Sequence, residues 1–295
     1  NNNNKPFKMK KAKVIAEIGC NHKGDMDIAK ELIKVAKIFC NADVVKFQKR
    51  NNKELLTEEQ YNAVHPNPAN SYGDTYGAHR EFLEFSLEQN RELKEYCEDL
   101  DIIWSTSTWD LTSAKEIASL NPVLIKIPSA CNNNYEMLGW LCENYDGEIH
   151  CSTGMTTKNE IEDLVSFFES KGKNKDLVLY NCTSGYPVPF EDVCLLDITL
   201  LKEKYGHRVK EIGFSGHHLG IAVDIAAYTL GATWVERHYT LDRTWKGTDH
   251  SASLEPAGLR KLVRDLKAVE KALTYKQTDI LEIESVQREK LKNRK

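Results

Sequence analysis

Two histidines, His217 and His238, stand where a single metal ion could bind both. Each lies near the carboxyl end of a predicted strand, at 210–218 and at 234–240, and a helical pattern connects the two strands. If these strands are parallel neighbours, their backbones lie about 4.8 Å apart, so both imidazoles can reach a divalent ion at about 2.1 Å. A pair of histidines alone is more often structural than metal-binding. Three further polar residues at the same end favour a site: Ser215, Glu236 and Asp249.

Three charged residues interrupt strand sequences that are otherwise apolar. Glu17 lies within VIAEIG, Lys46 within VVKFQ and Lys126 within LIKIPS. A buried acid or lysine needs a partner of opposite charge or a function. Side chains with hydroxyl or amide groups end or follow the predicted strands: Gln48, Thr106, Ser129, Ser152, Ser184 and Tyr186. Taken singly, each of these residues is more often part of a turn or of the surface than of a ligand site.

The residue types together indicate a particular chemistry. Lysines, hydroxyls and the N–H groups of turns bind small, highly charged anions such as a phosphate with a carboxylate. Two histidines supply a divalent metal and leave coordination positions open for water or a substrate oxygen. The carboxylates Glu17, Glu236 and Asp249 can bind sugar hydroxyls or move protons. We therefore expect carbon–carbon bond formation or cleavage on a phosphorylated small molecule.

These residues require a scaffold that brings many strand ends together, and the sequence predicts one. Strand patterns occur at 14–19, 44–48, 102–108, 124–129, 148–154, 177–184, 210–218 and 234–240. Helical patterns follow them at 27–39, 81–100, 111–120, 134–145, 158–172, 195–206, 219–232 and 255–273. Eight such units within about 260 residues predict an α/β fold, a single (β/α)8 TIM barrel, whose catalytic face is the carboxyl end of the strands. A doubly wound sheet is the alternative, but no G-x-G-x-x-G follows the first strand.

Composition sets the remaining expectations. The chain has 295 residues and a net charge of −4, which gives no sign of a nucleic-acid or membrane partner. Its eight cysteines form no Cys-x-x-Cys pair, so we expect reduced thiols and a cytoplasmic location. We predict a polar, disordered segment at 1–12, a catalytic barrel domain at 13–275 and a charged tail at 276–295. The polar stretch 49–78 is predicted to be a long loop that acts as a lid or a dimer contact.

Ten strings, spread in order over residues 14–260, resemble one enzyme family. They include AEIGCNHKGD, VVKFQ, IKIPSA, CSTGM, NCTSGYPVPFED, GFSGHH, ERHYTLDR and GTDHSASLEP. The chain resembles the sialic acid (N-acetylneuraminate) synthases, which belong to the superfamily of the deoxy-octulosonate-phosphate synthases. The resemblance implies condensation of phosphoenolpyruvate with the open-chain aldehyde of an N-acetylated hexosamine, typically N-acetylmannosamine, to give a nonulosonic (sialic) acid and phosphate. It also implies a homodimer and a divalent metal, with Mn2+ first and Mg2+ or Co2+ as alternatives.

Roles for individual residues follow from the same resemblance. The metal ligands would be His217 and His238. The phosphoenolpyruvate ligands would be Lys46, Thr106, Lys126, Ser129, Ser152, Ser184 and Ser215. The sugar ligands would be Glu17, Gln48, Tyr186, Glu236 and Asp249. The residues that take part in catalysis would be Glu17, Lys46, Lys126, Tyr186, Glu236 and Asp249.

The sequence departs from the family pattern at the sugar side of the site. Cys131 stands after IKIPSA, where the family usually has a carboxylate, so Glu17 carries the acid–base work or the substrate differs. Gly216 and His218 replace the Asp and Thr of the family's SDH-T string, and His218 has the opposite strand parity to His217. We therefore expect His218 to face away from the metal.

The chain departs from the family pattern in two further places, at its C-terminal end and at Ser184. Many members carry a C-terminal antifreeze-like domain that touches the sugar in the partner subunit, and residues 276–295 leave no room for it. Ser184 stands where other members carry Asn. The rivals are a deoxy-octulosonate-phosphate-type ulosonate synthase, a metal aldolase on the same barrel, and a non-catalytic sugar-binding barrel.

Overall fold

The computed structural model, which describes residues 7–292, contains a closed barrel of eight parallel strands. The strands are β1 (Lys13–Gly19), β2 (Val44–Lys49), β3 (Ile103–Thr108), β4 (Leu124–Ile127), β5 (Glu148–Ser152), β6 (Leu177–Cys182), β7 (Glu211–Gly216) and β8 (Trp234–His238). They pair in sequence order, and β8 closes the barrel by pairing with β1. The predicted (β/α)8 TIM barrel is confirmed.

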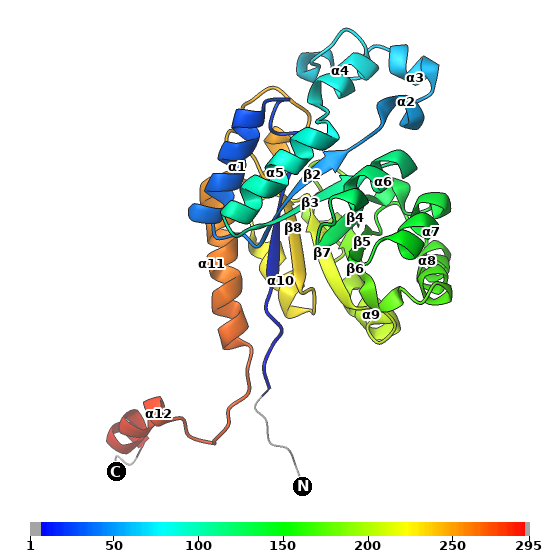
Figure 1. Ribbon diagram of the computed structural model, residues 1–295. Coiled ribbons are helices and arrows are strands. Elements are labelled where there is room, and N and C mark those ends of the chain that lie inside the picture. The colour runs from blue at the N-terminus through cyan, green and yellow to red at the C-terminus, as the bar shows by residue number, and fades with distance from the viewer. Residues whose placement is uncertain (1–6, 293–295) are drawn as a thin grey trace.

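Helices surround the barrel and follow the strands in alternation (Figure 1). They are α1 (Met26–Ile38), α5 (Leu87–Asp99), α6 (Leu111–Ser119), α7 (Tyr135–Asn144), α8 (Lys158–Ser170), α9 (Asp197–Tyr205), α10 (Ala222–Thr229) and α11 (Pro256–Ala272). The strongest amphipathic pattern belongs to α11, which buries Leu259, Leu262 and Leu266. Its spacing of three and four residues places these side chains on one face, toward the barrel.

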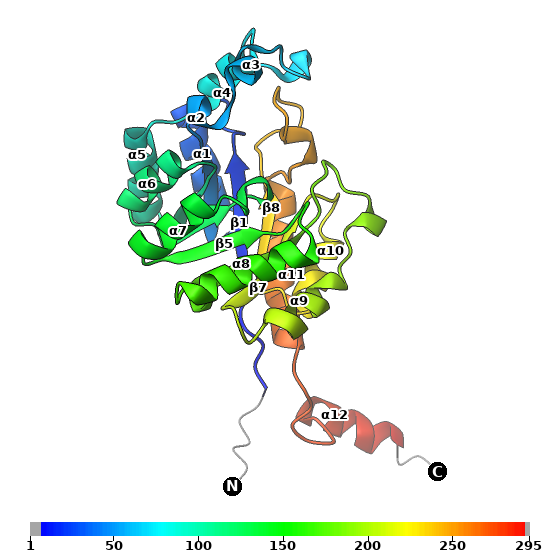
Figure 2. The ribbon, with the colours of Figure 1, turned by 90° about the vertical axis from the view of Figure 1, so that its right-hand side faces the viewer.

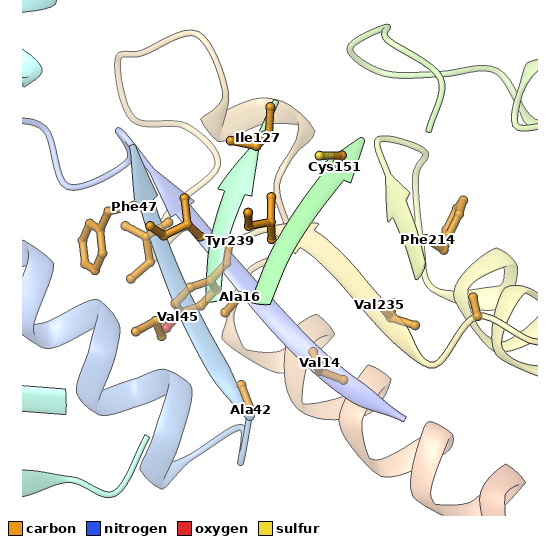
Figure 3. Close-up of a cluster of buried hydrophobic side chains, with 14 of the residues drawn as sticks. Val14, Ala16, Ala42, Val45, Phe47, Ile127, Cys151, Phe214, Val235 and Tyr239 are labelled. Atoms are coloured by element: carbon orange, nitrogen blue, oxygen red, sulfur yellow. The ribbon is translucent and has the colours of Figure 1, made fainter. Parts of the chain in front are cut away.

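The alternation of side chains along each strand divides the core into two layers. Outward residues such as Val14 and Ala16 of β1 and Val45 of β2 pack against the helices (Figure 3). Inward residues fill the barrel itself: Ile15, Val44, Leu124, Val178, Tyr180 and Trp234. Because the period is two, Glu17 has the same inward direction as Ile15.

The strand register brings the inward polar residues to one level. Glu17 pairs in register with Lys46 on one side and with His238 on the other. Ser215 of β7 pairs in register with Glu236 of β8. The hydrophobic layer below them ends at Trp234, two residues before Glu236. The carboxyl end of the barrel therefore carries the charged groups, as in other barrels of this type.

The expected long loop at 49–78 is wrong, and the expected helix at 81–100 is confirmed only from Leu87 to Asp99, as α5. The first region forms α2 (Asn52–Leu55), α3 (Glu58–Asn62), a 3-10 turn (Pro68–Asn70) and the start of α4 (Tyr76–Leu83). The long helix is interrupted because Ser86 caps a new one, α5, by accepting from the backbone N–H of Gln89. We call residues 50–83 the cap. Figures 1 and 2 show α2, α3 and α4 gathered beyond the barrel, on the side of the strand ends.

The two ends of the chain leave the barrel at the opposite side. After α11, the chain forms α12 (Glu282–Gln287) and a π-helical turn (Arg288–Lys292), which project away from the barrel (Figure 2). The predicted disordered segment 1–12 falls in part outside the described residues. No helix between residues 7 and 292 has the length and apolarity needed to span a bilayer. All eight cysteines are free thiols.

Candidate active site

Four buried charges from four strands meet at the carboxyl end of the barrel. Lys46 Nζ lies 2.7 Å from Glu17 Oε2 and 3.2 Å from Glu236 Oε2. Lys126 Nζ lies 3.0 and 3.1 Å from the two carboxylate oxygens of Glu236. All four residues are buried. The structure therefore brings together the charged residues that the strand sequences singled out, and each has a partner of opposite charge.

Burial and charge act differently on the two acids. Burial raises the pKa of Glu17, and the attraction of Lys46 offsets this only in part. Burial also acts to raise the pKa of Glu236, but Lys126 and Lys46 outweigh it and hold that pKa far below its usual range. Both oxygens of Glu236 are engaged, since Ser215 also donates to Oε1 at 2.9 Å. Glu236 thus stays ionised and holds the lysines, while Glu17 is the better group for proton exchange.

Serine hydroxyls extend this cluster around the barrel mouth. Lys46 Nζ donates to Ser107 Oγ at 2.9 Å, and Ser129 Oγ accepts from the backbone N–H of Gly154 at 2.9 Å. The predicted ligands that line the pocket are Glu17, Lys46, Gln48, Ser129, Ser152, Ser184, Tyr186, Ser215, His217, Glu236, His238 and Asp249. The pocket has a volume of about 550 Å³. Lys126 reaches the same cluster from below through its ion pair with Glu236.

Thr106 is a correction to the predicted set. It does not line the pocket, and its hydroxyl donates to the carbonyl of Ser107 at 3.4 Å. Strand alternation explains this, because Ser107 shares the inward direction of Ser105, which pairs in register with Lys46. Ser107 is therefore the β3 residue that faces the anion site.

The two histidines are suited to hold a divalent metal. Their ring centroids lie 5.5 Å apart. His217 Nδ1 donates to the carbonyl of Thr183 at 3.1 Å, which leaves Nε2 with a free lone pair. Burial, assisted by His238, lowers the pKa of His217 to about 3, so its imidazole is neutral at physiological pH. His238 Nδ1 is buried without a hydrogen-bond partner.

Two imidazoles fill only part of the coordination shell of a divalent metal. Within residues 7–292, no group of three His, Cys, Asp or Glu side chains is arranged to hold a metal ion. Two imidazoles leave positions for water and for substrate oxygens, which is the arrangement of a catalytic rather than a structural site. The ring of Tyr186 stands over the pair, with its centroid 4.6 Å from that of His217.

Cys131 cannot replace the carboxylate that the family usually has at this position. Its thiol is directed at the carbonyl of Trp109, 3.4 Å away, and the residue does not line the pocket. Burial raises the pKa of the thiol to about 11. The acids that line the pocket are Glu17, Glu236 and Asp249, and Glu17 and Glu236 both contact Lys46.

His218, one of the two residues that depart from the family pattern at 216–218, belongs to a buried polar network outside the barrel. His218 Nε2 lies 2.8 Å from Asp224 Oδ2, and Arg237 Nη1 lies 2.7 Å from the same oxygen. The expectation that His218 faces away from His217 is confirmed. A Cβ at position 216 would come within 2.6 Å of His218 Cε1, so the glycine and the histidine depend on each other.

We predict that Asp224→Asn destabilises the fold without entering the chemistry. Arg237 would lose its buried counter-charge, which costs about 3–5 kcal/mol of the free energy of unfolding. Chemical denaturation measures this loss. The matched control is Asp265→Asn, because Asp265 pairs with Arg264 on the surface, where a pair contributes about 0–1 kcal/mol. Equal effects of the two substitutions would contradict the assignment.

Sequence reasoning missed the part of the pocket that the cap supplies. The missed residues are Arg50, His65, Tyr76, His79, Arg80 and Trp109. Trp109 follows β3 directly, and strand position alone could have identified it. Arg50, His65 and Tyr76 lie in the stretch 49–78 that was expected to be a long loop, and His79 and Arg80 follow it directly. No periodic pattern relates these residues to the barrel mouth.

A closed parallel barrel with lysines, hydroxyls and paired histidines at its mouth places the chain among TIM-barrel enzymes that act on small anions. More narrowly, the NeuB family model matches residues 32–278, and the chain belongs to the NeuB family. The N-acetylneuraminate-9-phosphate synthase of Homo sapiens is 40% identical over 283 residues, which cover 94% of this chain and 76% of that protein. The N,N'-diacetyllegionaminic acid synthase of Campylobacter jejuni is 33% identical over 90% of this chain and 78% of its own length.

Solved structures agree with this family. The N-acetylneuraminic acid synthetase of Leptospira borgpetersenii, in complex with citrate, is 28% identical with a TM-score of 0.79, covering 96% of this chain and 93% of that chain. Synthases of this family condense phosphoenolpyruvate with amino sugars to give nonulosonic acids, and they generally depend on a metal. The chain is thus a sialic acid synthase-like transferase.

Proposed function

We propose that this chain condenses phosphoenolpyruvate with the open-chain aldehyde of an N-acetylated hexosamine, N-acetylmannosamine or a relative, and releases a nonulosonic acid and phosphate. The observation that carries the proposal is one pocket in which Lys46, serine hydroxyls and a histidine pair meet, with Lys126 behind it in contact with Glu236. Relatives at 38–40% identity are named for a 9-phosphate product, and those at 32–33% for diacetyllegionaminic acid.

Phosphoenolpyruvate binds at the lysine end of the pocket. Lys46 and Lys126 offset the charges of its carboxylate and phosphate, and the hydroxyls at the strand ends bind its oxygens. These hydroxyls belong to Ser107, Ser129, Ser152, Ser184 and Ser215. The two lysines share the carboxylate of Glu236, and Lys46 also contacts Glu17, so both ammonium groups are held at the place of the incoming anion.

The acceptor sugar binds between Glu17 and the histidines. Gln48 Nε2 donates to Glu17 Oε1 at 3.4 Å, which places an amide and an acid side by side for the sugar hydroxyls. Tyr186 and Asp249 approach from the loops after β6 and β8. The ring of Tyr186 can cover the sugar's apolar face.

The reaction forms one carbon–carbon bond and breaks one carbon–oxygen bond. The π electrons of phosphoenolpyruvate join its C3 to the aldehyde carbon, and Glu17 gives its proton to the aldehyde oxygen. Water adds to C2 and returns a proton to Glu17. Phosphate then leaves with the C2–O electron pair and takes up the proton of the remaining C2 hydroxyl, giving the 2-keto group. Lys46 and Lys126 stabilise the charge of the departing phosphate.

The metal of this proposal is Mn2+, with Mg2+ or Co2+ as alternatives, held by His217 and His238. When bound, it acts as a Lewis acid on a carbonyl oxygen.

We further propose a homodimer and a cytoplasmic location. Support for the location comes from the eight free thiols, which suit a reducing compartment. Support for the dimer comes from the family resemblance alone, and light scattering tests it.

Phosphate release tests the proposed function. The protein is mixed with Mn2+, phosphoenolpyruvate and, in turn, N-acetylmannosamine, its 6-phosphate, a diacetamido hexose or arabinose 5-phosphate. We expect phosphate release that depends on an N-acetylated acceptor. Release with arabinose 5-phosphate alone would favour an ulosonate synthase of the deoxy-octulosonate type. If none of the acceptors gives phosphate release while the metal site is fully occupied, the synthase is excluded and a sugar-binding barrel is favoured.

A further inference from the structure

A polar network crosses the barrel interior beneath the lysine site. The inward face of β5 carries Glu148, His150 and Ser152, in that order from the base of the barrel to its mouth, where Ser152 lines the pocket. His150 Nδ1 lies 2.6 Å from the hydroxyl of Tyr180 on β6, and His150 Nε2 lies 3.1 Å from Glu148 Oε2. His150 and Tyr180 are fully buried. The other inward side chains of this layer are apolar or indole rings: Ile15, Val44, Leu124, Val178 and Trp234.

The hydrogen bonds of this network run in one direction. Burial acts to raise the pKa of Glu148, but hydrogen bonds from His150 and Lys210 outweigh it and lower that pKa to about 2. The ionised carboxylate can only accept, so His150 Nε2 carries a proton. Burial lowers the pKa of His150, so its ring is neutral and Nδ1 is an acceptor. Tyr180 therefore donates to His150, and His150 donates to Glu148.

The ring of Tyr180 forms the floor beneath Lys126. Lys126 Nζ stands over the face of the ring, 4.0 Å from its centroid. A Cβ at Gly213 would come within 2.7 Å of Tyr180 Cε1, so the glycine provides the space in which the ring lies. The backbone of β7 and the hydrogen bond to His150 thus fix the ring. Donation of the hydroxyl proton toward an ionised carboxylate also polarises the phenol and makes the face of the ring more negative.

Lys126 needs this face because its counter-charge is shared. Among residues 7–292, its one ion-pair partner is Glu236, whose Oε2 also lies 3.2 Å from Lys46 Nζ. Burial lowers the pKa of Lys126, and the attraction of Glu236 offsets this only in part. An aromatic face stabilises an ammonium group more strongly in a desolvated site than at the surface. Tyr180 supplies such a face from the side opposite the pocket.

We propose that Tyr180 and His150, anchored by Glu148, are positioning residues that hold the Lys126 ammonium in place for phosphoenolpyruvate. The proposal rests on the proposed function and deepens its anion site. None of the three residues lines the pocket, so they act through Lys126 and do not touch the substrate. The affinity for phosphoenolpyruvate then depends on a layer of the barrel interior that lies below the site.

Substrate binding tests this role. With Mn2+ present, titration calorimetry gives the Kd of phosphoenolpyruvate, and phosphate release gives the KM of the acceptor. We expect Tyr180→Leu to weaken phosphoenolpyruvate by about 10- to 30-fold, the effect of one desolvated cation–π contact, and to leave the acceptor KM unchanged. Tyr180→Phe keeps the ring and loses only the polarising hydroxyl, so it should weaken phosphoenolpyruvate by about threefold.

Two further comparisons separate positioning from a purely structural role. In a Lys126→Ala background, Tyr180→Leu should no longer change the affinity for phosphoenolpyruvate, because the contact that it removes is already absent. His150→Leu removes the acceptor of the Tyr180 hydroxyl and should weaken phosphoenolpyruvate by about threefold. His150→Asn should restore the wild-type affinity, since its Oδ1 can replace Nδ1 as the acceptor.

Tyr145→Leu is the matched control. Tyr145 is also buried, and its hydroxyl donates to the carbonyl of Pro122 at 2.6 Å, but it packs in the layer between the barrel and the helices. The substitution should lower the free energy of unfolding and leave the Kd of phosphoenolpyruvate unchanged.

Three outcomes would overturn the positioning role. Tyr180→Leu could weaken both substrates by the same factor, its effect could persist undiminished in Lys126→Ala, or Tyr145→Leu could weaken phosphoenolpyruvate as much. If the wild type neither binds phosphoenolpyruvate nor releases phosphate with any acceptor, the proposed function itself is rejected. Calorimetry needs no turnover, so it decides the positioning role even when no acceptor reacts. If Tyr180→Leu does not fold, Tyr180→Phe and the two His150 variants decide.

Discussion

His238→Ala is expected to abolish both metal binding and turnover. The residue supplies one of the two imidazoles proposed to hold the metal, and its Nδ1 has no hydrogen-bond partner between residues 7 and 292. One remaining histidine cannot hold a divalent ion at the affinity of two. A Lewis-acid metal contributes several kcal/mol to the stabilisation of developing charge, so kcat should fall by about a thousandfold.

Metal content and turnover must be measured on the same preparations. We expect His238→Ala to lose its Mn2+ after dialysis, while the wild type retains it, and thermal unfolding should show that the variant remains folded. His207→Ala is the control, because His207 is exposed on the loop after α9 and should change neither quantity. Full turnover in His238→Ala would refute the metal assignment, and loss of turnover with metal retained would give His238 another role.

The barrel could be predicted because its strands are buried on both faces. Runs such as VVKFQ and LIKIPS leave few alternatives once they recur between amphipathic helices. The same runs identified Lys46 and Lys126, since a charge inside such a run is conspicuous. The order of pairing and the closure of β8 on β1 then determine that the two lysines meet Glu236.

The error at Thr106 shows the limit of reading strand ends as a group. Thr106 and Ser107 are both polar, and both lie within the last three residues of β3. A shift of one residue exchanges the two faces of a strand. Only the register with β2, where Lys46 pairs with Ser105 and Gln48 with Ser107, identifies the inward residue.

The cap could not be predicted because local chemistry, not periodicity, forms its helices. Two of these, α2 and α3, have four and five residues, too few for a hydrophobic period. They begin at side-chain caps: Asn51 accepts from the N–H of Glu54, and Thr57 and Gln60 form a reciprocal capping box. Such signals are compatible with turns as well as helices. The direction in which Arg80 points depends on tertiary packing that no local pattern encodes.

Lys126→Ala is the sharpest test of the anion site. Lys126 is 1% exposed, and its ammonium lies between the carboxylate of Glu236 and the face of Tyr180, 4.0 Å from the ring centroid. Removing it does not leave Glu236 unpaired, because Lys46 and Ser215 still contact that carboxylate. The fold should therefore survive, and the loss should appear in substrate binding.

The expected loss is specific to one substrate. Truncating one member of a buried charge pair costs about 2–5 kcal/mol, so kcat/KM for phosphoenolpyruvate should fall by about 30-fold or more. The KM of the acceptor sugar should change little, because the acceptor is proposed to bind between Glu17 and the histidines. Lys13→Ala is the matched control, since Lys13 pairs with Glu211 at the opposite end of the barrel. Equal weakening of both substrates would contradict the division of the pocket into an anion side and a sugar side.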